Sequence, residues 1–194
     1  MYMITFITDN GQIEHALTEL GAVKYPVTNP REHLHYRLST QPYLCRDSDR
    51  YKFILLDLMD SLQTAVFIDS GTEIIGLVNF SVYDEEHAMI IESICTPYSK
   101  GTGTQLINVL KSLGMLLRLK ELVVLSLPTA RPFYIKNGLI EKDGNLLGYT
   151  FEYPEYYNIP QGHTTRSKST RSKSKTKGTA KPKGSAKTKG KRNL

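Results

Sequence analysis

Three neighbouring β-rich runs constrain the fold of this 194-residue chain more than any other feature. Residues 64–69, 73–83 and 88–96 are rich in the β-branched and aromatic side chains that favour strands. Two polar turn sequences, Ser70-Gly71 and Asp84-Glu85-Glu86-His87, separate the runs. Because short turns of this kind join antiparallel neighbours, the sequence predicts a three-stranded meander.

The segments on either side of the meander alternate between helix and strand patterns. Leu106, Leu110 and Leu113 recur at helical spacing, and Asp143-Gly144 is a strong hairpin signal between two β-rich runs. The other predicted elements are strands at 4–8, 122–127, 139–142 and 146–153, and helices at 12–20, 53–62 and 130–137. We therefore predict an α/β protein with a mixed, largely antiparallel central sheet flanked by helices.

Residues 22–49 show no regular hydrophobic period. Pro26, Pro30 and Pro42 interrupt this stretch. Long irregular segments in compact domains are often binding loops. We expect this segment, together with the final hairpin, to recognise a substrate.

Charge divides the chain into two parts. The whole chain has 25 Lys and Arg residues against 19 Asp and Glu residues. Residues 161–194 contain twelve of the basic residues and no acidic one, so residues 1–160 carry a net charge of −6 and the tail +12. Residues 166–192 lack aromatic and large aliphatic side chains, and cannot offset an ordering cost of about 1–2 kcal/mol per residue. We predict a folded domain at 1–160 and a disordered basic tail at 161–194.

The tail composition is typical of segments that bind nucleic acid through phosphate contacts without reading bases. It resembles histone-like and viral DNA-packaging tails in composition, and its basic clusters also suit nuclear targeting or phosphorylation. A solubilising tail without a partner is the alternative. The expected locations are therefore the cytoplasm, the nucleus or a virion.

Several classes of protein are excluded by the composition. The sequence contains no run of about 18 apolar residues, so it predicts no membrane-spanning helix. The first residues lack the pattern of a signal peptide. Cys45 and Cys95 are too few for a disulfide framework and lack zinc-site spacing. We expect both cysteines to be reduced. His33 and His35 are expected in a loop and not at a metal, because no other ligand completes a coordination set.

A glycine-containing loop, Gly101-Thr102-Gly103, lies between a predicted strand and the leucine-patterned helix. Glycines let backbone N–H groups approach an anion, and a helix N-terminus adds about half a positive charge, so the place suits a phosphate or pyrophosphate. Leu106 stands at the third glycine position of the dinucleotide fingerprint, and no Gly-Lys-Ser/Thr follows as in a Walker loop. A tight turn with a packing glycine is the structural alternative.

Residues 130–139 read Ala-Arg-Pro-Phe-Tyr-Ile-Lys-Asn-Gly-Leu. With the meander, the glycine loop, the long helix and the apolar strand, this segment resembles the GNAT superfamily of N-acetyltransferases over about residues 60–153. The loop is similar to the family's pyrophosphate motif Q/R-x-x-G-x-G/A, and residues 130–139 to its A-x-x-F-Y-x-x-x-G-F block, with Leu139 in place of Phe. Tyr98 stands where the family usually has Gln or Arg, so a guanidinium is absent there. Lys100 could supply positive charge instead.

The resemblance implies transfer of an acetyl group from acetyl-coenzyme A to a primary amine, by direct attack in a ternary complex and without a metal. The strand at 88–96 would separate from the strand at 122–127 and pair with the pantetheine arm, while amides at 100–104 would hold the pyrophosphate. The implied coenzyme-binding residues are Ile94, Cys95, Thr96, Lys100, Gly101, Thr102, Gly103 and Thr104.

Two residues are candidates for proton transfer. Tyr134 matches the tyrosine that protonates the thiolate in many members of the family; the alternative is an aromatic side chain that only packs its helix. Glu92 is the candidate base, because period-two alternation places it on the face of Ile94, where desolvation would disfavour the ionised carboxylate. A glutamate paired with a nearby Lys or Arg is an equal alternative.

Two further residues near the motifs have simpler interpretations. Asn137 is interpreted as a helix-terminating residue before Gly138. Cys95 is interpreted as a small apolar strand residue, with a covalent acyl-cysteine route as the alternative. For the whole chain, the alternative to an enzyme is a GNAT-fold binding or structural protein associated with nucleic acid.

Overall fold

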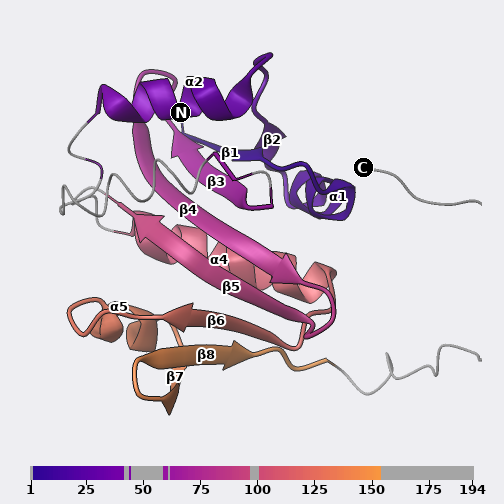
Figure 1. Cartoon of the computed structure of the whole chain (residues 1–194), viewed down its shortest axis with the longest axis vertical. Helices are drawn as coiled ribbons and strands as arrows, with labels where there is room; N and C mark the ends of the chain where they lie inside the picture. The colour runs from indigo at the N-terminus through magenta and orange to yellow at the C-terminus, as the bar shows by residue number, and fades with distance from the viewer. Residues whose placement is uncertain (1, 42–43, 45–58, 61, 97–100, 154–194) are drawn as a thin grey trace, which may run out of the picture. The chain divides into compact units, whose positions relative to one another are not determined.

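The computed structural model describes residues 2–41, 44, 59–60, 62–96 and 101–153. In these residues eight strands form one sheet in the order β2-β1-β3-β4-β5-β6-β8-β7 (Figure 1). The strands are β1 (Met3–Ile7), β2 (Val23–Lys24), β3 (Thr64–Asp69), β4 (Ile74–Tyr83), β5 (Ala88–Cys95), β6 (Glu121–Leu125), β7 (Ile140–Asp143) and β8 (Leu146–Thr150). The helices are α1 (Gly11–Glu19), α2 (Pro30–Ser39), α4 (Thr102–Leu116) and α5 (Arg131–Lys136).

The sheet is mixed. The pairs β1–β2 and β5–β6 are parallel, and the other neighbouring pairs are antiparallel. The predicted meander is confirmed as β3-β4-β5, and the predicted hairpin across Asp143-Gly144 as β7-β8. The α/β class and the largely antiparallel sheet are thus confirmed. The two-residue strand β2 was not predicted, because so short a strand carries no alternation.

Helices cover both faces of the sheet. On one face, α1 and α4 pack their apolar stripes against β-strand side chains such as Val66, Val78 and Phe80; Figure 1 shows α4 behind β4 and β5. On the other face, Leu34 and Leu38 of α2 pack in a cluster with Phe67, Leu77 and Cys95 of the sheet. The burial of these side chains supplies the main driving force for the fold.

Helix α2 contradicts the predicted irregular loop at 22–49. Pro30 stands at the first position of this helix, where its fixed φ angle suits a helix start. Leu34 and Leu38 are its buried residues, so the apolar stripe is too narrow to be recognised as a helical period. His33 therefore lies in a helix and not in a loop.

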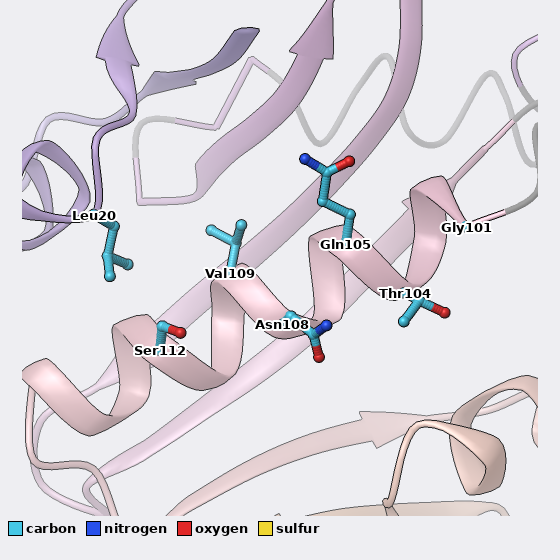
Figure 2. Close-up of a pocket in the computed structure, with 7 residues that line it drawn as sticks. All are labelled: Leu20, Gly101, Thr104, Gln105, Asn108, Val109 and Ser112. Atoms are coloured by element: carbon cyan, nitrogen blue, oxygen red, sulfur yellow. The ribbon is translucent and has the colours of Figure 1, made fainter. Parts of the chain in front are cut away.

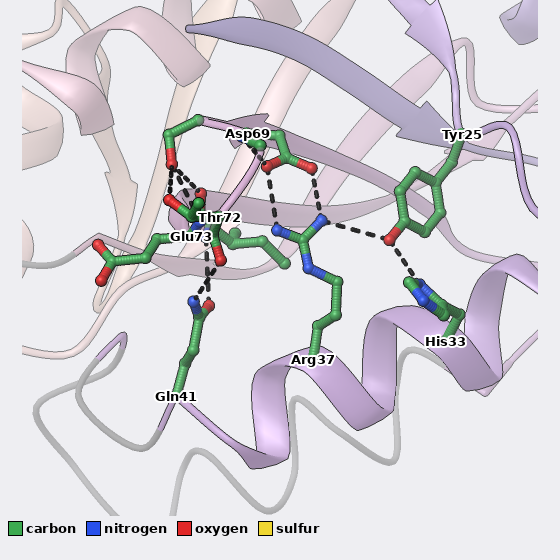
Figure 3. A network of polar contacts seen from close by, with 10 residues as sticks. Tyr25, His33, Arg37, Gln41, Asp69, Thr72 and Glu73 are labelled. Atoms are coloured by element: carbon green, nitrogen blue, oxygen red, sulfur yellow. Dashed lines mark hydrogen bonds and ion pairs between the residues drawn. The ribbon is translucent and has the colours of Figure 1, made fainter.

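A network of polar contacts fixes α2 to the sheet (Figure 3). The Arg37 guanidinium donates to both carboxylate oxygens of Asp69, at 2.5 and 3.0 Å, and to the Tyr25 hydroxyl at 3.3 Å. That hydroxyl also lies 2.6 Å from Nδ1 of His33. The hydrogen bond to Asp69 raises the pKa of Arg37, and the same bond lowers the pKa of Asp69.

Cys95 takes part in a disulfide bond, so the predicted reduced state is wrong for this residue. Sequence spacing could not reveal the bond, because a disulfide depends on spatial approach and geometry. Cys45 lies outside the described residues, as do residues 53–58 of the predicted helix at 53–62 and the whole tail at 161–194. Within the described part of the chain, every helix is too short or too polar to cross a membrane.

Candidate active site

Strands β5 and β6 pair over a short distance and then part. Their register runs from Ala88 opposite Glu121 to Ile91 opposite Val124, whereas β5 continues to Cys95 and stays paired with β4. In the described structure, the β5 edge beyond Ile91 that faces away from β4 therefore has no strand partner. Such an edge presents N–H and C=O groups, and it can pair with an extended ligand. Ile94 and Cys95 lie on this edge, and Thr96 follows it.

A β-bulge lies where this open edge begins. Asn79 is opposite Ser93 and Phe80 is opposite Ile91, so Glu92 is the extra residue on β5. Ile91 and Ile94 both contact the same core cluster although they are three residues apart, which regular alternation would not allow. The bulge interrupts the period-two alternation on which the placement of Glu92 on the face of Ile94 relied, so that placement stays a prediction. The Glu92 side chain is also exposed and not desolvated among isoleucines.

The open edge leads toward the N-terminus of α4. Gly101 precedes the helix with a φ angle of 101°, a left-handed conformation that favours glycine, and a Cβ there would have open space around it. The first helical bond runs from the Gln105 N–H to the Gly101 carbonyl. Helix geometry leaves the N–H groups of the first turn without intrahelical acceptors, and the helix dipole favours an anion at this end.

The second glycine of the loop has a packing role. A Cβ on Gly103 would lie 2.9 Å from the Phe133 ring, so this glycine lets α5 approach the first turn of α4. Gly76 of β4 is similar, since its Cβ would lie 2.5 Å from the Thr102 side chain; sequence reasoning missed it because it lies inside a strand. The phosphate interpretation therefore suits Gly101, and the packing alternative suits Gly103.

A groove of about 400 Å³ runs along α4 from this helix start. Figure 2 shows Thr104, Gln105, Asn108 and Ser112 of α4 along its wall. Their hydroxyl and amide groups can donate and accept hydrogen bonds. The groove thus adds uncharged polar groups along α4 to the open N–H groups of the helix start.

Helix α5 packs Phe133 against the same helix start and carries Tyr134 as its buried residue. Tyr134 is 5% exposed and belongs to the core cluster, with its ring centroid 5.1 Å from that of Phe133. Asn137 ends α5 and its side chain donates to the Phe133 carbonyl at 2.8 Å, which fits its predicted role. Lys111 of α4 donates to the Asn137 carbonyl at 2.6 Å, and burial lowers the pKa of Lys111.

A second groove, of about 630 Å³, lies at the β-bulge. Its lining includes Asp9, Asp60, Gln63, Ser81, Tyr83 and Glu92. We call it the bulge groove. Sequence reasoning missed it apart from Glu92, because its residues come from four separate segments. No group of His, Cys, Asp and Glu residues in the described part of the chain could hold a metal ion.

Two of the residues predicted near the coenzyme, Tyr98 and Lys100, lie outside the described residues. The others lie along one path, from the open β5 edge to the first turn of α4. Because Cys95 is in a disulfide bond, it has no thiolate to act as a nucleophile, and the acyl-cysteine alternative has no support.

No known family profile and no curated protein matches this sequence. Solved structures do match. The crystal structure of Tetrahymena Gcn5 has a TM-score of 0.52 at 18% sequence identity, over 79% of this chain and 99% of that chain.

The chain has the GNAT fold. Two other similar structures are an acetyltransferase of the GNAT family from Desulfovibrio desulfuricans (11% identity, 65% and 95% coverage, TM-score 0.49) and the aminoglycoside 6'-N-acetyltransferase from Enterococcus faecium (14% identity, 64% and 93% coverage, TM-score 0.48). The structural match to Gcn5, at a TM-score of 0.52, shows the fold alone, so the activity is argued from the site. In this GNAT fold, the open β5 edge and the α4 N-terminus adjoin each other.

Proposed function

We propose that the chain is an acetyl-coenzyme A-dependent N-acetyltransferase. The observation that carries this proposal is the parting of β5 from β6 after Ile91, next to the open helix start at Gly101. The amide groups of a pantetheine arm match a strand edge with unpaired hydrogen-bonding groups. Its pyrophosphate matches a glycine-preceded helix N-terminus. One ligand of this chemistry would use both features.

The proposed roles follow the path of that ligand. Ile94, Cys95 and Thr96 would offer backbone groups to the pantetheine arm. The amides of Lys100, Gly101, Thr102, Gly103 and Thr104 would hold the pyrophosphate, with added charge from Lys100. The thioester end would then lie near Glu92, where the open edge begins.

The reaction requires two proton movements. A primary amine attacks the thioester carbonyl carbon, the carbon–sulfur bond breaks, and the electron pair leaves with sulfur. Glu92 would accept a proton from the ammonium form of the acceptor, which its exposure in the bulge groove permits. Tyr134 would donate a proton to the departing thiolate. Its packing between Phe133 and the core holds the phenol ring in one place.

Calorimetry of the full chain with acetyl-coenzyme A tests binding, and thioester turnover with a panel of amines tests catalysis. Gly101→Ala should weaken coenzyme binding, because it strains the backbone at the helix start. Gly71→Ala is the matched control, since Gly71 also has a positive φ angle (92°) and open space around it but lies in the β3–β4 turn. Failure of the unmodified chain to bind the coenzyme at submillimolar concentration would contradict the proposal.

The alternative is a GNAT-fold protein that binds without catalysis. The burial of Tyr134 in the core favours it, because an aromatic side chain that only packs would look the same. Coenzyme binding without turnover of any amine would support this alternative. If turnover occurs and Tyr134→Phe leaves it unchanged, the assignment of Tyr134 as the acid is wrong.

The basic tail is proposed to associate with nucleic acid. Its twelve positive charges and its lack of acidic residues support phosphate contacts. Fluorescence anisotropy with labelled duplexes of unrelated sequence should give equal affinities that fall steeply with salt. Salt-independent binding would contradict this assignment.

A further inference from the structure

Helix α5 carries Tyr134 but is too short to be stable by itself. It has six residues, and isolated helices shorter than about 12–15 residues are marginal in water. Contacts with neighbouring elements must therefore hold it in place. Two of these contacts come from α4, the helix whose start is proposed to hold the pyrophosphate.

The first contact is apolar and lies at the start of α4. A Cβ on Gly103 would lie 2.9 Å from the Phe133 ring, so this ring packs directly on the α4 backbone. The Phe133 and Tyr134 rings meet edge to face, with their centroids 5.1 Å apart. Because apolar contacts are non-directional, this one brings α5 close to α4 without fixing its position along α4.

The second contact is polar and comes from Lys111, further along α4. Its ammonium group donates to the Asn137 carbonyl at 2.6 Å, and Asn137 is the residue that ends α5. Lysine side chains commonly donate to the last carbonyls of a helix in this way. Hydrogen bonds from a charged donor are shorter and stronger than those between neutral groups. The bond therefore fixes the C-terminal end of α5 against α4.

Two neighbours hold the Lys111 ammonium group in this position. It lies 3.9 Å from the centroid of the Tyr149 ring on β8, which is within the range of a cation–π interaction. Gly138 leaves room for it, since a Cβ there would lie 3.3 Å from Nζ. Burial lowers the pKa of Lys111, in agreement with a contact from which water is partly excluded. Lys111 thus joins α4, the end of α5 and β8 at one point.

The Lys111 contact reaches Tyr134 through the backbone. The Tyr134 carbonyl accepts from the Asn137 N–H at 3.0 Å and from the Leu139 N–H at 3.1 Å. The residue whose carbonyl Lys111 holds is therefore bonded directly to the Tyr134 backbone. A displacement of the α5 end would move that backbone and, with it, the phenol group.

We propose that Lys111 is a positioning residue for acetyl transfer, which holds α5 and the Tyr134 phenol in a fixed place relative to the start of α4. This inference rests on the proposed function, in which α4 holds the pyrophosphate and Tyr134 protonates the thiolate. Lys111 belongs to the first of these elements and bonds to the second. It would set the distance between thioester and acid without touching the substrate.

Steady-state kinetics of the full chain, with acetyl-coenzyme A and the amine of the panel that is turned over fastest, tests the proposal. Lys111→Met keeps an unbranched apolar stem and a similar helix propensity, but removes the donor and the charge. It should lower kcat roughly 10- to 100-fold, because a displacement of about 1 Å can cost about 100-fold. The coenzyme Kd from calorimetry should stay unchanged. Lys111→Arg keeps a charged donor and should recover most of kcat.

A double-mutant cycle with Tyr134→Phe tests whether the effect passes through Tyr134. In the Tyr134→Phe background, Lys111→Met should cause no further loss of kcat. An equal loss in both backgrounds would overturn the proposal. So would a coenzyme Kd that weakens by the same factor as kcat falls, because α4 itself would then be displaced.

Arg131→Met is the matched control. Arg131 also connects α5 to a neighbouring element, through an exposed ion pair with Glu141 of β7. Exposed pairs of this kind contribute little, so kcat should stay close to that of the unmodified chain. A loss equal to that of Lys111→Met would mean that any weakened contact of α5 has this effect, and would refute a specific role for Lys111.

Hydrogen–deuterium exchange measures the same contact without turnover. The amides of Asn137 and Leu139 should exchange roughly 10-fold faster in Lys111→Met, the order expected for the loss of a hydrogen bond from a charged donor. The Gln105 amide, which bonds to Gly101 at the start of α4, should be unaffected. Unchanged exchange at Asn137 and Leu139 would overturn the inference. Faster exchange there, in a chain that acetylates no amine, would retain the Lys111 contact and refute the enzyme, so the two failures are distinguishable.

Discussion

Two polar regions on the same sheet differ in how completely their groups are paired. In the network of Figure 3, Arg37, Asp69, Tyr25 and His33 form a continuous chain of hydrogen bonds. At the β-bulge, side-chain atoms of Asn79 and Ser93 are buried without hydrogen-bond partners in the described structure, and so is the side-chain oxygen of Gln63 in the bulge groove. The first region fixes a helix to a sheet. The second retains unused hydrogen-bonding capacity, as expected for a place that receives a ligand.

Breaking the paired region should have the largest effect. Arg37 and Asp69 side chains are 16% and 9% exposed, and Arg37→Ala leaves the Asp69 carboxylate without its partner. We expect a loss of about 3–5 kcal/mol in the free energy of unfolding, measured by urea denaturation. Arg131→Ala is the control, because its ion pair with Glu141 is more exposed and should contribute less than about 1 kcal/mol. Equal losses in both variants would show that burial does not govern the network.

Removing polar groups from the unpaired region should have the opposite effect on stability and raise the free energy of unfolding. Asn79→Val replaces two unpartnered amide atoms with methyl groups in a strand that favours β-branched residues. We expect a gain of up to about 1–3 kcal/mol in the free energy of unfolding, and a loss of turnover if the region serves the acceptor. A destabilised variant would mean that Asn79 is paired in solution, and the contrast between the two regions would disappear.

Acid should weaken the paired region through Asp69. Because the hydrogen bond from Arg37 lowers the pKa of Asp69 in the folded chain, this carboxylate contributes stability above its unfolded pKa of about 3.9. That contribution is lost as the pH falls through the lowered folded pKa. Each unit of difference corresponds to about 1.4 kcal/mol. Denaturation curves between pH 7 and pH 2 should show a smaller decline for Asp69→Asn than for the unmodified chain; parallel declines would contradict this.

Most strands could be predicted because their alternation and turns are local properties. The 64–69 run matches β3 residue for residue, and the leucines of α4 mark a wide apolar stripe. Helix α2 was missed because Leu34 and Leu38 form a stripe of one side chain per turn. A helix of this kind is stabilised by tertiary contacts that the sequence does not display.

Part of the candidate site could also be predicted, because some of its residues lie in local sequence patterns. Gly101 and Tyr134 belong to contiguous motifs that can be recognised in the sequence. The bulge at Glu92 could not, because it depends on how β4 pairs with β5. Asp9, Asp60 and Gln63 are far apart along the chain and meet when β1, β3 and β4 assemble.

The short pairing of β5 with β6 has a consequence for how binding and folding are linked. In the described residues, the strands β6, β8 and β7 join the rest of the sheet along four residue pairs, Ala88 to Ile91 of β5 with Glu121 to Val124 of β6. A ligand on the free part of β5 would occupy the place of a missing strand segment. Coenzyme at 100 times its dissociation constant would then add about 2.7 kcal/mol to the free energy of unfolding. The coenzyme concentration would then determine how stable the connection between the two parts of the sheet is.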